Sequence, residues 1–273
     1  MLTIAARAHD YGRQMPETLF ARIAADGFEG VMLAFQKAIE GVSSYCEVTP
    51  EHIARVQQAL QTNNLALGTL GVYMELGLTV ESGRQEAVKQ FLAGLRVAGC
   101  MGLAQVASET TPMQKQPAGA TPKEAYRCLV RSMEEVLPAA EALGISVCLE
   151  PVYYHALSSA PLAKRLLDDL KSPNLKITLD PANLLDISRF EDQYAVWDEA
   201  FALLGDAISI VHMKGIRAVN GKREKAARFS ESVLDYPYLF ACIKQLNRPL
   251  HIVREETDPA TARDDVAYLK SLC

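Results

Sequence analysis

Eight short apolar runs alternate with eight longer amphipathic segments along the 273 residues of the chain. Short apolar runs are typical of buried strands, and apolar residues spaced three and four apart are typical of helices with one buried face. Strands are expected at residues 2–9, 30–35, 66–73, 102–108, 145–150, 175–180, 208–214 and 249–256. Helices are expected at residues 15–27, 49–64, 83–99, 121–144, 158–172, 191–206, 236–247 and 258–272. This order predicts one α/β domain, residues 1–273, folded as a (β/α)8 TIM barrel.

A doubly wound open sheet is the alternative for alternating strands and helices. No Gly-x-Gly-x-x-Gly motif follows any expected strand, and a count of eight strands favours the barrel. Thr49 and Thr121 each precede a proline, which is the pattern of a helix N-cap. The longest irregular stretch, residues 111–122, follows the fourth expected strand and should lie at the catalytic end of the barrel.

Composition excludes several classes of protein. The formal net charge is −5, so no excess of basic residues is available to bind nucleic acid. No run of about 18 uncharged apolar residues occurs, so no membrane-spanning helix is expected. Residues 1–10 read as a first strand and not as a signal peptide. The six cysteines are scattered without a Cys-x-x-Cys motif, which indicates free thiols and a cytoplasmic location.

Four expected strands end on residue types that bind metal ions. Glu150 ends the fifth strand, Asp180 ends the sixth, His212 lies near the end of the seventh and Glu255 near the end of the eighth. Successive members are 30, 32 and 43 residues apart, one strand–helix unit per step. Because the carboxyl ends of barrel strands share one rim, these side chains should converge.

Three carboxylates at one point repel one another, and a divalent cation would remove that conflict. The predicted ligand set has three carboxylates and only one imidazole, which suits Mn²⁺, Mg²⁺ or Co²⁺, with Zn²⁺ as a further alternative. Alternation along the fifth strand places Cys148 and Glu150 on one face, with Val147 and Leu149 toward the helices.

Four segments resemble those of a known superfamily: CLEPV, SPNLKITLDPANLL, VHMKG and SVLDYPYLF. Together they resemble the xylose isomerase-like barrel superfamily, and within it the sugar phosphate isomerase/epimerase group that includes the ketose 3-epimerases. The resemblance extends over nearly the whole chain and implies that Glu150, Asp180, His212 and Glu255 bind one divalent metal ion. The ending VREET admits Glu255 or Glu256 as the fourth ligand. Glu255 is preferred because it shares strand parity with Val253 and matches the family's ending.

The resemblance also implies a reaction. Members of this group are metal-dependent isomerases or epimerases of a sugar or sugar phosphate, which react through an enediolate intermediate stabilised by the metal. Epimerisation needs two proton-transferring groups on opposite faces of that intermediate. The resemblance implies that Glu150 and Glu255 form this catalytic pair, with Asp180 and His212 mainly as metal ligands.

The chain departs from the ketose 3-epimerases at several positions. Their substrate-contacting glutamate, six residues after the first ligand, is Ala156 here, and their histidine three residues after the aspartate is Asn183. Their arginine after the seventh strand has its nearest counterpart in Arg217, and Gly215 replaces an acidic residue. The metal ligands therefore carry over, whereas the pocket for an uncharged ketose does not.

Further candidate substrate-binding residues lie at the same rim: His9, Glu109, His155, Asn183, Lys214 and Arg217. The basic residues after the seventh strand, which include Lys222 and Arg223, suit an anionic substrate or form a solvated loop.

Three other functions remain open. A dehydratase of the 3-dehydroshikimate type would use the same metal site to abstract a proton and expel hydroxide. An endonuclease of the same fold acts on abasic DNA, but it uses extra histidines, and this acidic chain has five histidines in all. A catalytically silent barrel could act as a binding subunit. The expected partner is a small sugar or sugar phosphate, and binding to nucleic acid or to a membrane is not expected. A homo-oligomer is compatible with the sequence.

Overall fold

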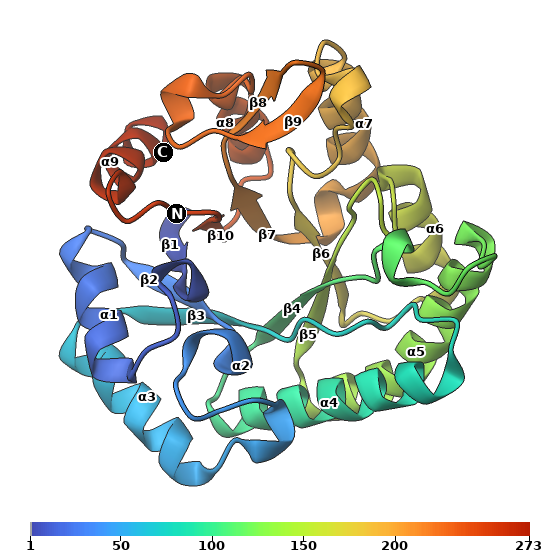
Figure 1. Cartoon of the computed structure of the whole chain (residues 1–273), viewed down its shortest axis with the longest axis horizontal. Helices are drawn as coiled ribbons and strands as arrows, with labels where there is room; N and C mark the ends of the chain where they lie inside the picture. Colours follow the sequence, from blue (N-terminus) through green and yellow to red (C-terminus); the bar gives the residue numbers. More distant parts are fainter. Residues whose placement is uncertain (1) are drawn as a thin grey trace.

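The computed structural model describes residues 2–273, in which eight parallel strands close into a barrel surrounded by helices (Figure 1). The closed order is β1-β10-β7-β6-β5-β4-β3-β2. The barrel strands are β1 Leu2–Arg7, β2 Gly30–Leu33, β3 Ala66–Gly71, β4 Gln105–Glu109, β5 Ser146–Glu150, β6 Leu175–Leu179, β7 Ile208–Met213 and β10 Leu250–Arg254. Seven of these strands lie within the ranges expected from the sequence, and β4 extends one residue beyond its expected range. The predicted TIM barrel is therefore confirmed.

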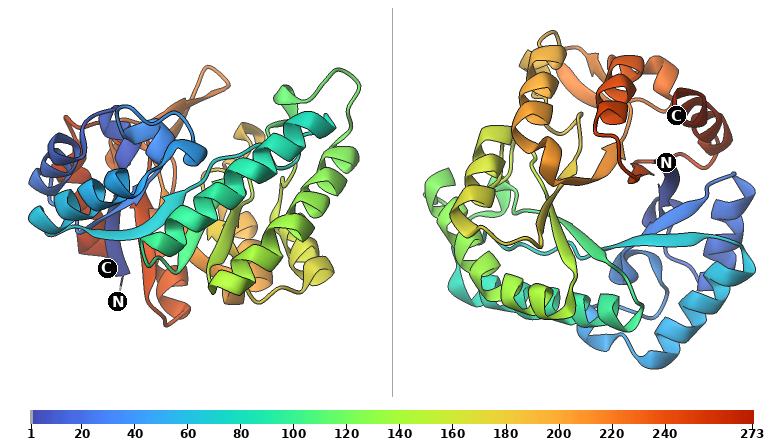
Figure 2. Two further views of the ribbon diagram at one scale, coloured as in Figure 1. Left: turned by 90° about the horizontal axis from the view of Figure 1, so that it is seen from below. Right: turned by 180° about the vertical axis from the view of Figure 1, so that it is seen from behind.

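One long helix follows each barrel strand and covers its outer side (Figures 1 and 2). These helices are α1 Pro16–Ala25, α3 Pro50–Thr62, α4 Glu81–Cys100, α5 Pro122–Leu143, α6 Ala160–Leu170, α7 Gln193–Leu204, α8 Tyr236–Gln245 and α9 Ala262–Leu272. A single turn, α2 Phe35–Ala38, precedes α3. Thr49 and Thr121 cap α3 and α5 through capping boxes, as their sequence pattern predicts.

The core has two parts. The larger part lies between the strands and the helices and includes Val147 and Leu149. The smaller part fills the inside of the barrel and includes Cys148, Ala107 and Val253. The alternation expected along the fifth strand is thus present, and it turns Glu150 toward the inside of the barrel.

After β7 the structure contains a hairpin that the sequence analysis did not expect. A two-stranded antiparallel hairpin, β8 Ile216–Val219 and β9 Lys222–Lys225, follows β7. Its turn is Asn220-Gly221, and both residues have positive φ, 51° and 71°. Asn-Gly between two short extended segments is a strong hairpin signal, and it was available in the sequence. In the side view of Figure 2 the hairpin projects from the end of the barrel opposite the chain termini.

In the part of the chain that the structure describes, no helix is both long and apolar enough to cross a membrane. All six cysteines are free, as expected.

Candidate metal centre

The four predicted ligands lie together at the carboxyl ends of β5, β6, β7 and β10. Glu150 is the last residue of β5, Asp180 and Glu255 directly follow β6 and β10, and His212 is the penultimate residue of β7. All four side chains are at most 1% exposed. Burying so many ionisable groups is costly unless they are paired or bind a cation.

His212 lies at the centre of the group. Its Nδ1 atom is 3.0 Å from Glu150 Oε2 and 3.0 Å from Glu255 Oε1. Glu150, Asp180 and His212 each offer one ligand atom, and these atoms lie within 4.8 Å of one another. The structure therefore brings together three of the predicted ligands around one point, with Glu255 against the same imidazole.

One oxygen of each carboxylate is already bound by the protein. Asn183 Nδ2 donates to Glu150 Oε1 at 2.6 Å, and Lys214 Nζ donates to Glu255 Oε2 at 2.9 Å. Asp180 Oδ1 accepts from the backbone N–H groups of Ala182 and Asn183 at 2.9 and 3.0 Å. Such contacts fix the orientation of a ligating carboxylate while leaving its other oxygen available.

Several polar atoms of these four side chains lie against one another or against a cation without a well-oriented hydrogen bond. Among the described residues, Glu150 Oε2, Asp180 Oδ2, Glu255 Oε1 and His212 Nδ1 are buried beside charged groups in this way, and His212 Nε2 has no hydrogen-bond partner. Buried polar atoms are almost always hydrogen-bonded, so atoms without a hydrogen bond on four adjacent side chains require an explanation. A divalent cation coordinated by these oxygen and nitrogen atoms would satisfy them, and three carboxylates with one imidazole form a ligand set that suits such an ion.

Two positively charged side chains also reach into the site. Lys214 Nζ lies 2.8 Å from Asp180 Oδ2, and Arg7 Nη1 lies 3.2 Å from Glu255 Oε1. Arg7 also pairs with Asp10 at 2.8 Å. The sequence analysis expected uncompensated repulsion among the carboxylates. This was wrong, because Lys214 and Arg7 come from strand ends adjacent to the ligands and offset much of the negative charge.

The charges shift the pKa values of the cluster in opposite directions. Burial raises the pKa of Glu150, whereas Glu255 has a pKa well below its usual range because Arg7, His212 and Lys214 outweigh its burial. Burial opposes the charge on His212, but Glu255 and Glu150 raise its pKa to about 10. Without a metal ion, His212 is therefore a cation held between carboxylates.

The structure places Glu255, and not Glu256, among the predicted ligands. Glu255 is completely buried against His212 and Lys214, whereas the Glu256 side chain is 33% exposed and lies 3.9 Å from Lys214. Glu256 has a positive φ of 55°, which turns the chain away from the direction of the strand. Its side chain lines the cavity above the centre instead.

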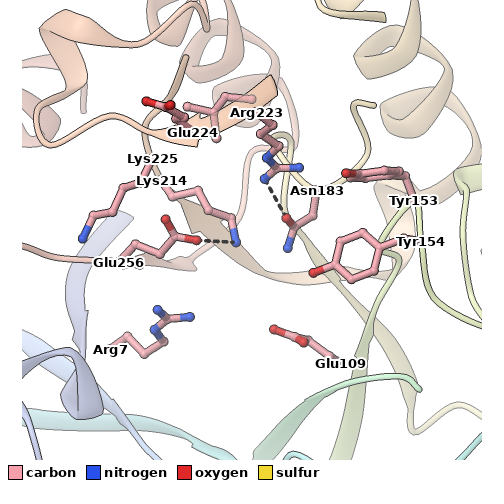
Figure 3. Close-up of a pocket in the computed structure, with 11 residues that line it drawn as sticks. Arg7, Glu109, Tyr153, Tyr154, Asn183, Lys214, Arg223, Glu224, Lys225 and Glu256 are labelled. Atoms are coloured by element: carbon pink, nitrogen blue, oxygen red, sulfur yellow. Dashed lines mark hydrogen bonds and ion pairs between the residues drawn. The ribbon is translucent and has the colours of Figure 1, made fainter. Parts of the chain in front are cut away.

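A cavity of about 360 Å³ opens above the cluster, and Figure 3 shows the side chains that line it. Three of the predicted substrate-binding residues line it: Glu109, Asn183 and Lys214. Burial, followed by the charges of Glu150 and Glu255, raises the pKa of Glu109 to about 7. The other lining residues are Arg7, Tyr153, Tyr154, Ile216, Arg223, Glu224, Lys225 and Glu256. Lys225 was not singled out from the sequence because the hairpin that carries it was not recognised.

The other three predicted substrate-binding residues do not line this cavity. Arg217 points to the outer side of the hairpin, where it lies 3.2 Å from Glu224. His9 packs edge-on against Tyr73, and burial lowers its pKa to about 3. His155 is 2% exposed, and neither of its ring nitrogens has a hydrogen-bond partner.

Comparison with known proteins agrees with this geometry. Residues 20–272 match the sequence profile of the family described as xylose isomerase-like TIM barrel. The chain belongs to this family. No protein of curated function matches the chain significantly in sequence.

Several solved structures are similar to the chain along its whole length. The 3-keto-D-glucoside 4-epimerase of E. coli is 19% identical with a TM-score of 0.77, and the alignment covers 99% of this chain and 100% of that one. A D-tagatose 3-epimerase-like protein is 14% identical with a TM-score of 0.78, over 99% and 96%. A xylose isomerase-like TIM barrel protein from Mycobacterium smegmatis, in complex with magnesium, is 13% identical with a TM-score of 0.72, over 99% and 96%. At these identities the likeness shows the fold.

Proposed function

We propose that this family member is a divalent-metal-dependent isomerase or epimerase of a sugar or sugar derivative, which reacts through an enediolate intermediate. The observation that carries the proposal is the convergence of buried ligand atoms on Glu150, Asp180, His212 and Glu255 that make no well-oriented hydrogen bond. The epimerase names of two structural neighbours, and the magnesium of a third, support the same class. Mn²⁺, Mg²⁺ and Co²⁺ are the ions that we expect, with Zn²⁺ as the alternative.

A divalent cation at this centre would supply Lewis-acid polarisation of the substrate carbonyl oxygen. Glu150 and Glu255 are the proposed acid/base pair. They project from β5 and β10, which are separated in the barrel by β6 and β7. Two carboxylates on different sides of the substrate can remove a proton from one face of a carbon and return it to the other.

The chain also provides fixed positive charge where the substrate oxygens would lie. Lys214 lines the cavity and is held by Asp180 and Glu255 at 2.8 and 2.9 Å. An ammonium group fixed in this way can donate a hydrogen bond to an oxygen that gains negative charge, without having to reorganise first. Lys214 is therefore proposed to bind and orient the substrate.

Metal binding and proton exchange test the proposal separately. The EDTA-treated protein is titrated separately with Mn²⁺, Mg²⁺, Co²⁺ and Zn²⁺ by calorimetry, alongside His212→Gln, which should lose most of the affinity. The loaded protein is then incubated in D₂O with D-fructose, D-tagatose, a 3-keto-D-glucoside and 3-dehydroshikimate. An isomerase or epimerase incorporates deuterium next to the carbonyl, and NMR detects this before the product is known.

The same experiment separates the alternatives. A dehydratase would convert the shikimate-type acid to a product that has lost water and absorbs in the ultraviolet. A catalytically silent barrel would give no exchange with any member of the panel. Failure of the wild type to bind any of the four metal ions would reject the proposed centre itself.

A further inference from the structure

The β8–β9 hairpin is held against the mouth of the cavity by backbone contacts at its base. Ala226 N donates to Gly215 O at 2.9 Å, and Val233 N donates to Ile216 O at 2.9 Å. A Cβ atom on Gly215 would lie only 3.0 Å from both Ala226 Cβ and Ala226 O. Gly215, which replaces an acidic residue of the ketose 3-epimerases, thus allows the returning chain to approach closely.

The two faces of the hairpin carry different charges. Arg217 is paired with Glu224 across the strands, and Ala218 with Arg223. Because side chains alternate, Arg217 and Glu224 share the other face of the hairpin, where they lie 3.2 Å apart and neutralise each other, although Glu224 also reaches the edge of the cavity. Arg223 and Lys225 share the inner face and line the cavity.

Arg223 is held one residue away from the candidate metal centre. Its Nη2 donates to Asn183 Oδ1 at 3.0 Å (Figure 3). Asn183 Nδ2 in turn donates to Glu150 Oε1 at 2.6 Å. The two contacts fix the orientation of the Asn183 amide, since the reverse orientation would place its NH₂ against a guanidinium. Arg223 Nη1 is 3.4 Å from Leu185 O. None of these partners carries a charge that would neutralise Arg223.

The other cations of the cavity are already paired. Arg7 pairs with Asp10 and Glu255, and Lys214 with Asp180 and Glu255. In contrast, Arg223 and Lys225 form no ion pair within 4.0 Å in the described part of the chain. Glu109 lies on the opposite wall in Figure 3. Positive charge without a partner is therefore concentrated on the hairpin side of the cavity.

We propose that Arg223 and Lys225 bind an anionic group, a phosphate or a carboxylate, at the end of the substrate remote from its reacting carbon. A guanidinium can donate to two oxygens of such a group, and Lys225, on the same face of the hairpin, adds positive charge to the cavity. This inference rests on the proposed function and narrows its substrate class to ketoses that carry a terminal anion. It also assigns to the hairpin the selection between charged and uncharged sugars.

The matched arginines on the two faces of the hairpin allow a direct test. Binding of D-fructose, D-fructose 6-phosphate and D-fructuronate is measured by calorimetry with the Mn²⁺-loaded wild type, Arg223→Gln and Arg217→Gln. Glutamine can still donate to Asn183 but carries no charge. A charge-assisted hydrogen bond corresponds to a roughly 10- to 100-fold change in affinity. The wild type and Arg217→Gln should therefore prefer one or both anionic sugars by about that factor, and Arg223→Gln should lose the preference.

The comparison of the two anionic sugars shows which group the site accepts. Equal affinity of the wild type for charged and uncharged sugars, or no measurable affinity for either anionic one, overturns the inference. So does an equal loss in the two arginine variants. Because the Mn²⁺ titration without sugar is a separate measurement, a normal metal affinity with no anion preference would reject this inference and leave the proposed metal centre standing.

Discussion

Lys214 Nζ lies 2.8 Å from Asp180 Oδ2, and both side chains are almost completely buried. The same ammonium group donates to Glu255 Oε2 at 2.9 Å. The strand that ends at Asp180 thus presents one oxygen to two backbone N–H groups and the other to a buried cation. Asp180 is therefore a stabilising partner in the metal-free protein, in addition to its proposed role as a ligand.

Asp180→Asn should lower the melting temperature measured in EDTA. The substitution removes the closer of the two carboxylates within 3 Å of Lys214 Nζ, and weakening a buried charged hydrogen bond costs about 1–3 kcal/mol. Chains of about 150–250 residues shift by about 2–4 °C per kcal/mol, so a decrease of several degrees is expected. Scanning calorimetry measures it, with the exposed Asp206→Asn as the control. A variant that melts above the wild type in EDTA would mean that carboxylate repulsion outweighs the Lys214 contact.

Asp180→Asn should also lose most of the stabilisation by metal. An ion that binds only the folded state adds roughly 2.7 kcal/mol at about 100 times its Kd. The wild type should therefore melt a few degrees higher in Mn²⁺ than in EDTA. An undiminished gain in Asp180→Asn would show that Asp180 is not a ligand.

Glu255 and Glu256 both follow β10, so substituting each in turn tests which of them is the fourth metal ligand. Glu255→Gln should weaken Mn²⁺ binding by more than the roughly 10- to 100-fold that loss of a supporting hydrogen-bond partner costs. Glu256→Gln should bind Mn²⁺ almost as the wild type does, because its side chain is 33% exposed and faces the cavity. Calorimetric titration compares the two. A larger loss in Glu256→Gln would show that the chain rearranges after Arg254 when the metal binds.

The barrel and the convergence of four side chains could be predicted because both follow from periodicity and strand order. The partners of those side chains could not. Lys214 reaches Asp180 and Glu255 across three strand ends, and no sequence spacing encodes that contact. Arg217 and Arg223 look equivalent in the sequence, and only the hairpin register separates an outward arginine from an inward one. The Asn-Gly turn was the signal that would have revealed this register.

His155 should make the protein sensitive to mild acid. Burial lowers its pKa to about 4, whereas the unfolded chain should titrate near 6.5. Below pH 6.5 the unfolded state binds a proton that the folded state does not, so the free energy of unfolding falls as the pH falls toward 4. At pH 5 this amounts to about 2 kcal/mol relative to pH 7.5.

His155→Phe removes this contribution and keeps a ring of similar size. The wild type should lose about 2 kcal/mol more than the variant between pH 7.5 and 5, measured by urea unfolding in EDTA. Other buried histidines, such as His9, are present in both proteins, so their contributions to the pH dependence of the free energy of unfolding cancel in the comparison. Parallel pH profiles of the two proteins would show that the His155 ring finds a proton acceptor in the folded state.

The resemblance to the ketose 3-epimerases places a substrate-contacting glutamate at the position of Ala156, which is 1% exposed here. A Cβ atom on Gly77 would lie 2.9 Å from Ala156 Cβ, so the two segments are in close contact and leave no room for a longer side chain. Ala156→Glu should therefore bury an unpaired carboxylate in a filled site, at a cost of several kcal/mol. The melting temperature should drop by several degrees or more, whereas Ala118→Glu, in an exposed loop, should leave it unchanged. Affinity for D-fructose should not improve. A variant that melts like the wild type and binds D-fructose more tightly would show that the loop after β5 adapts, and that one glutamate separates this cavity from a pocket for uncharged ketoses.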